Sequence, residues 1–253
     1  MEKDERLLLA SIEDKARRCQ RTNAPQHTGF LSLEQCAAAE DICRGEHYRG
    51  LLYGGYEDAE RRVMIFLPDY MDEEDIPGQF QPLSAIRAEL SKGAQKLSHR
   101  DYLGALLGLG VERSVIGDIL VRDDGADIIV LAEMADFFVR NFEKAGRMNL
   151  HVSQIELDSI KQSYVDHSEI TDTVASLRLD NLISSAFRLS RGAAQEAVRQ
   201  GLVSVNGRQS LKADMALDEG DKLVLRGKGK AVLKEVGGRS RKDRIIVTID
   251  KYK

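Results

Sequence analysis

Apolar residues near the start of the chain recur at steps of three and four, which is the period of an amphipathic helix. This pattern predicts a helix over residues 1–24. Ser32 is a favourable N-cap and predicts a second helix, Leu33–Arg44, that stops at Gly45. We therefore expect the chain to open with two helices.

Two β-like runs follow, Tyr48–Tyr53 and Arg62–Leu67, and the glycine pair between them favours a hairpin. The acidic stretch Asp69–Gly78, which follows one proline and contains another, is typical of a linker. Residues 1–75 are therefore expected to form an N-terminal α/β domain.

Residues 79–157 alternate between the periods of strand and helix. The expected elements are the strands Leu83–Leu90, Ser114–Val121, Asp127–Leu131 and Asn149–Ile155 and the helices His99–Leu109 and Ala132–Lys144. This β-α-β-β-α-β order is that of ferredoxin-like domains and of RNA-recognition motifs. The two central strands contain no aromatic residue, so we do not expect this sheet to stack bases.

Residues 158–173 are polar and predict a second linker. Over 174–253 the pattern predicts helix, capped helix, strand, turn and strand. Ser190 is expected to cap the second helix, and Gly201 to adopt the left-handed conformation just beyond its end. Asn206–Gly207 predicts a tight hairpin turn. The expected fold class is α+β, with three small domains.

Charge divides the chain unevenly, although its net charge is only -4. Residues 174–253 hold 17 Lys and Arg against 9 Asp and Glu, a net of +8. Residues 1–173 hold 20 basic and 32 acidic residues, a net of -12. A basic domain on an acidic body is typical of a module that docks on phosphates. The alternative is a solvated, lysine-rich surface.

Composition narrows the class of protein further. Hydrophobic residues make up 42% and charged residues 31%, as in soluble globular proteins. No apolar run approaches the roughly 20 residues of a membrane helix, and the charged first residues do not resemble a signal peptide. Three cysteines, an odd number, favour a reducing cytosol. We therefore expect a cytoplasmic protein without a membrane partner.

The helix that Ser190 caps carries a polar row. Arg191, Gln195 and Arg199 stand at i, i+4 and i+8 and so share one side. Two guanidiniums beside a helix N-terminus suit neighbouring phosphates, whereas a merely solvated surface helix is the alternative.

The spacing of these residues closely resembles the S-four RNA-binding domain. The motif residues are Arg-Leu-Asp at 178–180, Ser-Arg at 190–191, Gly-x-Val-x-Val-Asn-Gly at 201–207 and Gly-Asp at 220–221. The resemblance covers about 60 residues, from 174 to about 235.

Further motifs resemble the YlmH family of Gram-positive bacteria over essentially the whole chain. They are Gly-Gly-Tyr at 54–56, Ala-Glu-Arg at 59–61, Ser-His-Arg-Asp-Tyr-Leu-Gly at 98–104 and Ile-Gly-Asp-Ile at 116–119. The resemblance implies an N-terminal domain, a ferredoxin-like middle domain and an S-four module. It also implies RNA binding on the large ribosomal subunit, in the rescue of stalled subunits that still carry peptidyl-tRNA.

We expect the S-four module to supply most of the affinity for ribosomal RNA and tRNA. The candidate residues are Arg178, Arg188, Ser190, Arg191, Gln195, Arg199, Asn206 and Lys212, together with Asp180, which is expected to orient Arg178 rather than to touch RNA. The middle domain is a candidate for a second, tethered contact through Arg87, His99, Arg100 and Arg113. No cofactor, metal or small-molecule substrate is expected.

His99-Arg100-Asp101 resembles both the kinase catalytic loop and the His-Arg-Leu-Asp motif of pseudouridine synthases. It lacks the downstream asparagine of the former and is one residue short of the latter. We expect Ser98 and Asp101 to start a helix, with Asp101 favoured by the helix dipole.

Two other patterns resemble ligand sites. Cys36, Cys43 and His47 share a helical face without the paired spacing of a zinc site, so a buried thiol face is expected. Residues 227–230 lack the spacing of a nucleotide-binding phosphate loop and predict a basic turn.

Two alternatives to a non-catalytic RNA-binding protein stay open. An RNA-modifying enzyme with an S-four tail would be favoured by an open cleft and a perturbed carboxylate near Asp101 or Asp118. A protein-interaction scaffold that uses the acidic N-terminal part is the other.

Overall fold

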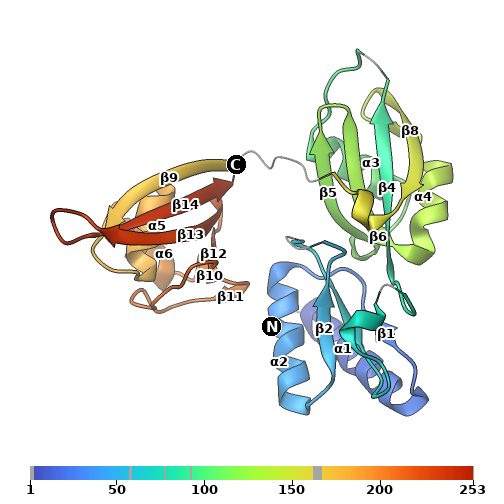
Figure 1. Cartoon of the computed structure of the whole chain (residues 1–253), viewed down its shortest axis with the longest axis horizontal. Helices are drawn as coiled ribbons and strands as arrows, with labels where there is room; N and C mark the ends of the chain where they lie inside the picture. Colours follow the sequence, from blue (N-terminus) through green and yellow to red (C-terminus); the bar gives the residue numbers. More distant parts are fainter. Residues whose placement is uncertain (1–2, 57–58, 77, 92, 162–166, 253) are drawn as a thin grey trace. The chain divides into compact units, whose positions relative to one another are not determined.

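The computed structural model divides the chain into two compact units, Met1–Ser163 and Tyr164–Lys253 (Figure 1). The described residues are 3–56, 59–76, 78–91, 93–161 and 167–252. The helices and the three separate sheets agree with the α+β class that the sequence predicts. Among the described residues, no helix combines the length and the apolar character needed to cross a membrane.

The first unit begins with two helices packed on a small antiparallel sheet. These elements are α1 (Lys3–Thr22), α2 (Leu33–Glu46), β1 (Gln26–His27), β2 (Gly50–Tyr53) and β3 (Val63–Phe66), with the strands in the order β1-β3-β2. The helices share one core with Met64 and Phe66. Both predicted helices and the hairpin are confirmed. The strand β1 escapes prediction because two residues show no alternation.

The helix α2 ends two residues later than predicted. Ser32 caps its start, and its hydroxyl accepts the backbone N–H of Gln35 at 3.3 Å. At the other end the helix passes Gly45 and stops at His47, whose φ is 55° and whose backbone N–H bonds the carbonyl of Cys43. The left-handed residue therefore sets the helix end, and the glycine is accommodated inside the last turn.

The three cysteines are buried and free, which confirms the expected thiol face. Cys36 and Cys43 lie on the inner side of α2 in the core that also holds Cys19. Burial raises the pKa of the Cys36 thiol to about 11, so the reactive thiolate form is disfavoured.

The acidic stretch Asp69–Gly78 is not a linker. Met71 and Ile76 are buried in a core cluster, and a short 3-10 turn, η1 (Glu73–Asp75), lies between them. The guanidinium of Arg49 donates to the carbonyls of Pro68 and Met71 at 3.2 and 3.0 Å. The segment is therefore packed against the protein, with most of its acidic residues exposed. Two apolar residues in a polar run were too weak a pattern to predict this packing.

The second sheet of the first unit has five strands in the order β5-β6-β4-β8-β7. The strands are β4 (Leu83–Leu90), β5 (Ile116–Arg122), β6 (Gly125–Leu131), β7 (Lys144–Ala145) and β8 (Met148–Ile155), and the helices are α3 (His99–Gly108) and α4 (Ala135–Asn141). Both helices pack on one face, where Tyr102, Leu106 and Phe138 are fully buried.

The helix α4 is shorter than the predicted Ala132–Lys144. A 3-10 turn, η3 (Ala132–Met134), precedes it, and the buried Phe142 turns the chain away after Asn141. Residues 144–145 then pair with β8 as β7, around the left-handed Gly146. The predicted helix was too long at its C-terminal end, because the apolar residues keep a helical period up to the start of this edge hairpin.

The helix-free face of this sheet is covered by the rest of the same unit. Leu83, Ile129 and Leu131 share a core with Phe30, Ile65 and other residues of the N-terminal part, and Leu157 and Ile160 pack against this cluster. This is the face on which RNA-recognition motifs bind their ligand. Here the apolar side chains of this face are covered by other residues of the same unit.

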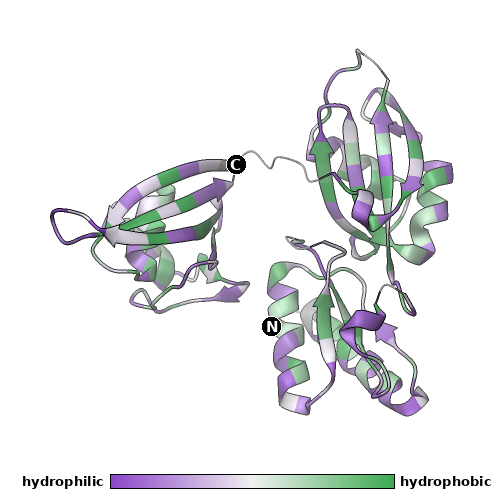
Figure 2. Ribbon diagram, in the orientation of Figure 1, coloured by the Kyte–Doolittle hydropathy of each residue, from purple (hydrophilic) through white to green (hydrophobic). Residues whose placement is uncertain are grey.

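The second unit is a six-stranded antiparallel sheet with two helices on it, in the order β11-β10-β12-β13-β14-β9. Its elements are β9 (His167–Val174), α5 (Leu179–Phe187), α6 (Arg191–Arg199), β10 (Val203–Val205), β11 (Arg208–Gln209), β12 (Lys222–Leu225), β13 (Gly229–Arg239) and β14 (Ile245–Tyr252). Figure 2 shows both hydrophobic and hydrophilic residues along β13 and β14. The buried ones stand at alternate positions, Ala231 and Leu233 in β13 and Val247 and Ile249 in β14, as in a sheet with one buried face.

The predicted second linker over 158–173 is wrong at its C-terminal end. Residues 167–174 form β9, which pairs with β14 from Val174 opposite Ile245 to His167 opposite Tyr252. Ile170 and Val174 of this strand contact the core. An edge strand with so few apolar residues gives no alternating pattern, so its sequence is that of a loop.

The predicted turns of the second unit are confirmed. The hydroxyl of Ser190 accepts the backbone N–H of Ala193 at 3.2 Å. Gly201 has φ 68°, and the N–H of Leu202 bonds the carbonyl of Ala197 at 3.0 Å, so the end of α6 is a Schellman motif. Asn206 and Gly207 have φ of 50° and 80°, as a two-residue hairpin turn requires.

Candidate nucleic-acid interface

A buried carboxylate joins the starts of the two helices in the second unit. Asp180, in the first turn of α5, has no exposed surface. It accepts hydrogen bonds from Arg178 Nε at 3.2 Å and from Gln195 Nε2 at 2.8 Å. Arg191 Nε approaches the same carboxylate at 3.5 Å. The predicted bond from Arg178 is present, and Asp180 also orients two residues of α6.

The hydrogen bonds keep Asp180 ionised despite its burial. Desolvation alone would raise its pKa, but the hydrogen bonds from Gln195 and Arg178 outweigh it and lower the pKa below the usual range. The charge also lies at the start of α5, where the helix dipole favours an anion. The site thus presents two guanidiniums around a fixed internal anion.

The polar row of α6 is divided in two. Arg191 and Gln195 turn toward Asp180, whereas Arg199 pairs with Glu196 at 2.9 Å. The side chain of Arg191 is 60% exposed and leaves most of its donors open to a ligand. Arg191 is therefore the best placed residue of the row to bind phosphate, because it stands in the first turn of a capped helix.

The remaining predicted residues lie around this centre. Arg188 is exposed, ends α5 in a left-handed conformation with φ 51°, and has no ion pair among the described residues. Lys212 is exposed in the loop before β12. The side-chain amide of Asn206 donates to Asp221 at 2.7 Å and accepts the backbone N–H of Lys222 at 2.9 Å. Asn206 thus holds the hairpin turn to β12.

In the first unit, Arg87 is part of a buried ion pair. Its guanidinium donates to both oxygens of Asp127 at 2.8 and 2.9 Å and to the carbonyl of Ser159 at 2.8 Å. Arg122 bonds the same carboxylate, which has no exposed surface. The geometry therefore gives Arg87 a structural role on the covered face of the sheet, in place of the expected RNA contact.

Arg113 is also directed inward. Its guanidinium donates to the carbonyls of Ile116 and Gly117, the latter at 3.2 Å. Burial and the nearby charge of Arg61 lower its pKa to about 10. Of the expected second contact, only His99 and Arg100 are exposed, at the start of α3.

The Gly-Gly-Tyr, Ala-Glu-Arg and Ile-Gly-Asp-Ile motifs, at 54–56, 59–61 and 116–119, are joined by hydrogen bonds. They connect the N-terminal part of the first unit to its five-stranded sheet. Asp118 accepts the hydroxyl of Tyr56 at 2.9 Å and the backbone N–H groups of Glu60 and Arg61 at 2.7 and 3.1 Å. Burial raises the pKa of Asp118 against these hydrogen bonds. A Cβ at Gly117 would meet the ring of Phe30 at 2.6 Å, which explains the glycine. The sequence motifs include these positions, but their spacing does not predict that Asp118 contacts Tyr56 and Arg61.

Both candidate acids are hydrogen-bonded within the protein. Asp101 is exposed, and its carboxylate accepts the backbone N–H and the hydroxyl of Ser98 at 2.8 and 2.7 Å. These bonds lower its pKa and cap α3, as the sequence predicts. Asp118 has a perturbed pKa, but three donors occupy its oxygens.

Two family models match the chain. Residues 83–159 match the putative RNA-binding domain in YlmH, and residues 177–223 match the S4 (S-four) domain. The second match includes Arg178, Asp180, Arg191 and Gln195.

The chain is also similar to known proteins. The ribosome-associated protein quality control protein P2 of Bacillus subtilis is 32% identical over 252 residues, covering 99% of this chain and 96% of the relative. The solved structure of the cell division protein ylmH from Streptococcus pneumoniae matches with a TM-score of 0.51 at 21% identity. That match covers 64% of this chain and 97% of the other.

Proposed function

This chain belongs to the YlmH family, and on that premise we propose that it is a non-catalytic protein that binds ribosomal RNA and tRNA on the large ribosomal subunit. Its relative in Bacillus subtilis is named as a ribosome-associated quality control protein, and both family models describe RNA-binding domains. We further propose that it acts in the rescue of stalled subunits that still carry peptidyl-tRNA. Such a role implies a cytoplasmic location.

The arrangement around Asp180 carries this proposal. A buried anion holds Arg178 at the start of α5, Arg191 at the start of α6 and Gln195 one turn further along α6. Backbone N–H groups at a helix start and planar guanidiniums both favour phosphate oxygens. The surrounding residues 174–253 carry a net charge of +8, which strengthens the attraction over a longer range.

The first unit adds a ferredoxin-like part in this proposal. Its β-α-β-β-α-β order and the strand order β5-β6-β4-β8 support that fold for residues 79–157, with an N-terminal part over 1–75 packed on the helix-free face. A second RNA contact then has to use the start of α3, through His99 and Arg100. The acidic N-terminal part is left for contacts other than phosphates.

The roles of Asp101 and Asp118 favour a binding protein over an RNA-modifying enzyme. Asp101 caps a helix, and Asp118 joins two parts of one unit. A nucleophile or general base needs an oxygen within reach of its substrate. The carboxylates that the sequence marks as candidates are thus used by the fold.

Co-sedimentation of the full chain with separated ribosomal subunits tests the function. We expect the protein to pellet with large subunits, more strongly when they carry peptidyl-tRNA, and to stay in the supernatant with small subunits at the same salt. Crosslinked RNA should then derive from ribosomal RNA and tRNA. Equal binding to both subunits, or no binding to either, would reject the proposal.

A further inference from the structure

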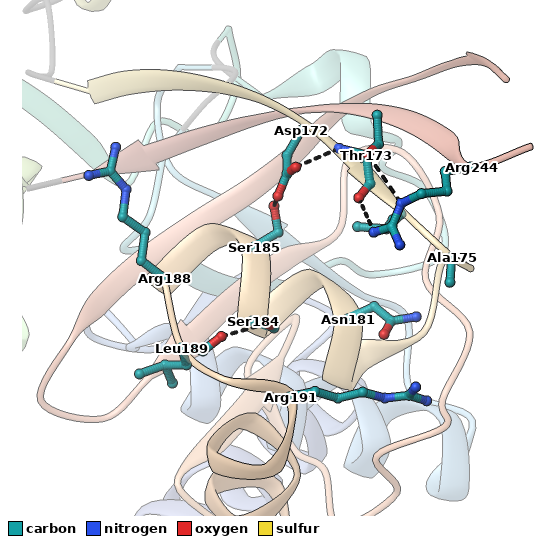
Figure 3. Close-up of a pocket in the computed structure, with 11 residues that line it drawn as sticks. Asp172, Thr173, Ala175, Asn181, Ser184, Ser185, Arg188, Leu189, Arg191 and Arg244 are labelled. Carbon is teal, nitrogen blue, oxygen red and sulfur yellow. Dashed lines mark hydrogen bonds between the residues drawn. The ribbon is translucent and has the colours of Figure 1, made fainter. Parts of the chain in front are cut away.

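An open pocket lies beside the Asp180 centre, between α5, the start of α6 and the strands β9 and β14 (Figure 3). Its volume is about 410 Å³, within the range of roughly 300–1,000 Å³ that small-ligand sites have. A phosphate group alone would leave most of this space to solvent. The pocket therefore has room for a phosphate with its sugar and base.

Three guanidiniums from three different elements line the pocket. Arg188 ends α5, Arg191 begins α6, and Arg244 immediately precedes β14. One carboxylate, Asp172, faces them, and it accepts hydrogen bonds from Ser185 Oγ at 2.6 Å and from the backbone N–H of Thr173 at 2.7 Å. The lining that the structure describes is thus positive overall, and the charge of Asp172 is bonded within the protein.

Neutral polar groups follow one side of α5 into the same space. Asn181, Ser184 and Ser185 stand three and four residues apart along α5 and line the pocket. Figure 3 shows Ser185 directed at Asp172 and Ser184 at Leu189, with Arg188 on the opposite side from Arg191 and Arg244. None of the lining residues within the described part of the chain is aromatic. A base in the pocket would therefore stack on a guanidinium plane, as bases do in single-stranded RNA recognition.

We propose that this pocket takes one nucleotide that is splayed out of a structured RNA. The inference rests on the proposed RNA-binding function and gives it a local specificity. Arg191, at the capped start of α6, binds the phosphate, because the helix N-terminus already favours an anion there. Ser184 Oγ donates to the carbonyl of Leu189 at 2.7 Å, and Asn181 Nδ2 donates to the hydroxyl of Ser176 at 3.0 Å. The α5 side chains therefore offer acceptor oxygens to the ribose, whose 2′-hydroxyl can donate to them.

Arg244 makes the pocket selective for an unstacked base. Its Nε donates to the hydroxyl of Thr173 at 3.2 Å and its Nη2 to the carbonyl of Thr173, which hold the guanidinium against β9, and the residue is exposed. A fixed guanidinium stacks on a base at a lower entropic cost than a mobile one. Both Thr173 and Arg244 lie outside residues 177–223, which the S4 model matches. The flanking strands therefore add the recognition element to a general phosphate-binding module.

Two RNA hairpins of the same length test the inference with the full chain. One is fully paired and the other carries a single bulged uridine, and binding is measured by fluorescence polarisation. We expect wild type to bind the bulged hairpin at least five-fold more tightly. Arg244→Ala should reduce this preference to less than two-fold and keep the affinity for the paired hairpin within about two-fold of wild type.

Arg241→Ala is the matched control, because Arg241 is exposed in the same loop and does not line the pocket. It should keep the five-fold preference. Arg188→Asn is a second pocket variant, since asparagine tolerates the left-handed backbone at this position, and it too should weaken the preference. Thermal melts identify any variant that is misfolded.

Equal binding of both hairpins by wild type would overturn the pocket inference while leaving the proposed function intact. So would a preference that survives in a folded Arg244→Ala protein. Failure of wild type to bind either hairpin, with large subunits unbound as well, would instead reject the proposed function.

Discussion

Gln195 on α6 donates a 2.8 Å hydrogen bond to the carboxylate of Asp180 on α5. This contact joins the two helices of the second unit through a charge that has no exposed surface. Because Arg178 and Arg191 converge on the same carboxylate, one buried residue sets the positions of the groups that we assign to RNA. In the proposed function, Asp180 therefore acts on binding by positioning these groups, without contact to the RNA.

Replacing Asp180 with asparagine should destabilise the second unit and weaken RNA binding together. The asparagine amide has the shape of the carboxylate but lacks its negative charge. Its N–H groups would also face the donors of Arg178 or Gln195. We expect a loss of about 1.5–3 kcal/mol in the free energy of unfolding, the usual size for a hydrogen bond to a charged group. Urea denaturation of the full chain measures this loss.

The control for that variant is Glu196→Gln, which removes an exposed carboxylate from the neighbouring helix α6. Its free energy of unfolding should change by less than about 0.5 kcal/mol, as for surface substitutions in general. If Asp180→Asn were as harmless as this control, the proposed role of the buried carboxylate would be wrong.

Stability should depend on acid through the same group. The pKa of Asp180 is lowered in the folded state, whereas an unfolded aspartate titrates near 3.9. The stabilisation is therefore complete above about pH 4 and is lost as the pH falls through the folded pKa. Thermal melts between pH 2 and 6 should show a shallower acid decline for Asp180→Asn than for wild type. Parallel curves would assign the acid sensitivity to other carboxylates.

The strand β9 should be needed for a stable second unit. A fragment of residues 164–253 keeps β9, whereas 174–253 leaves β14 as an unpaired edge. Several ladder hydrogen bonds at about 0.5–1.5 kcal/mol each predict a difference of at least about 3 kcal/mol. Urea midpoints of the two fragments measure it. Coincident midpoints would show that β9 contributes nothing to the fold.

Much of the second unit follows from its sequence because its signals are local. Ser190, Gly201 and Asn206 act through the backbone within three residues, so a cap, a helix end and a turn could each be predicted. The strand β9 could not, since its pairing with β14 lies more than seventy residues away in the chain and its polar residues suit an exposed edge. Local patterns contain no information on such a partner.

In the candidate site, too, local contacts could be predicted from the sequence and distant ones could not. Arg178 and Asp180 are two residues apart, and their bond was predicted, but the burial of Asp180 depends on α6. In the first unit Arg87 was assigned to RNA because an arginine in a strand gives no sign of its partner. That partner, Asp127, comes from the neighbouring strand forty residues later.

Asp101→Asn should leave the binding of RNA unchanged. The carboxylate is bonded to Ser98 at the start of α3, and its pKa is lowered by those bonds. We expect affinity for large subunits within about two-fold of wild type. Mass spectrometry of RNA incubated with wild-type protein should reveal no new nucleoside. A modified nucleoside that disappears with Asp101→Asn would establish the enzyme alternative.

Binding of Arg191→Ala to purified large subunits tests the central claim most directly. Alanine is preferred to glutamate, because a carboxylate at this position would face Asp180. The lost pair is 3.5 Å long and 60% exposed on the arginine side, so stability should change by less than about 1 kcal/mol. Arg140→Ala, an exposed arginine on α4, is the charge-matched control.

We expect the affinity of Arg191→Ala in quantitative co-sedimentation to fall ten-fold or more, since a charge-assisted contact contributes about 1.5–3 kcal/mol. The affinity of Arg140→Ala should stay within about two-fold of wild type. Undiminished co-sedimentation of a well-folded Arg191→Ala protein would contradict the assignment of the α5–α6 face to RNA.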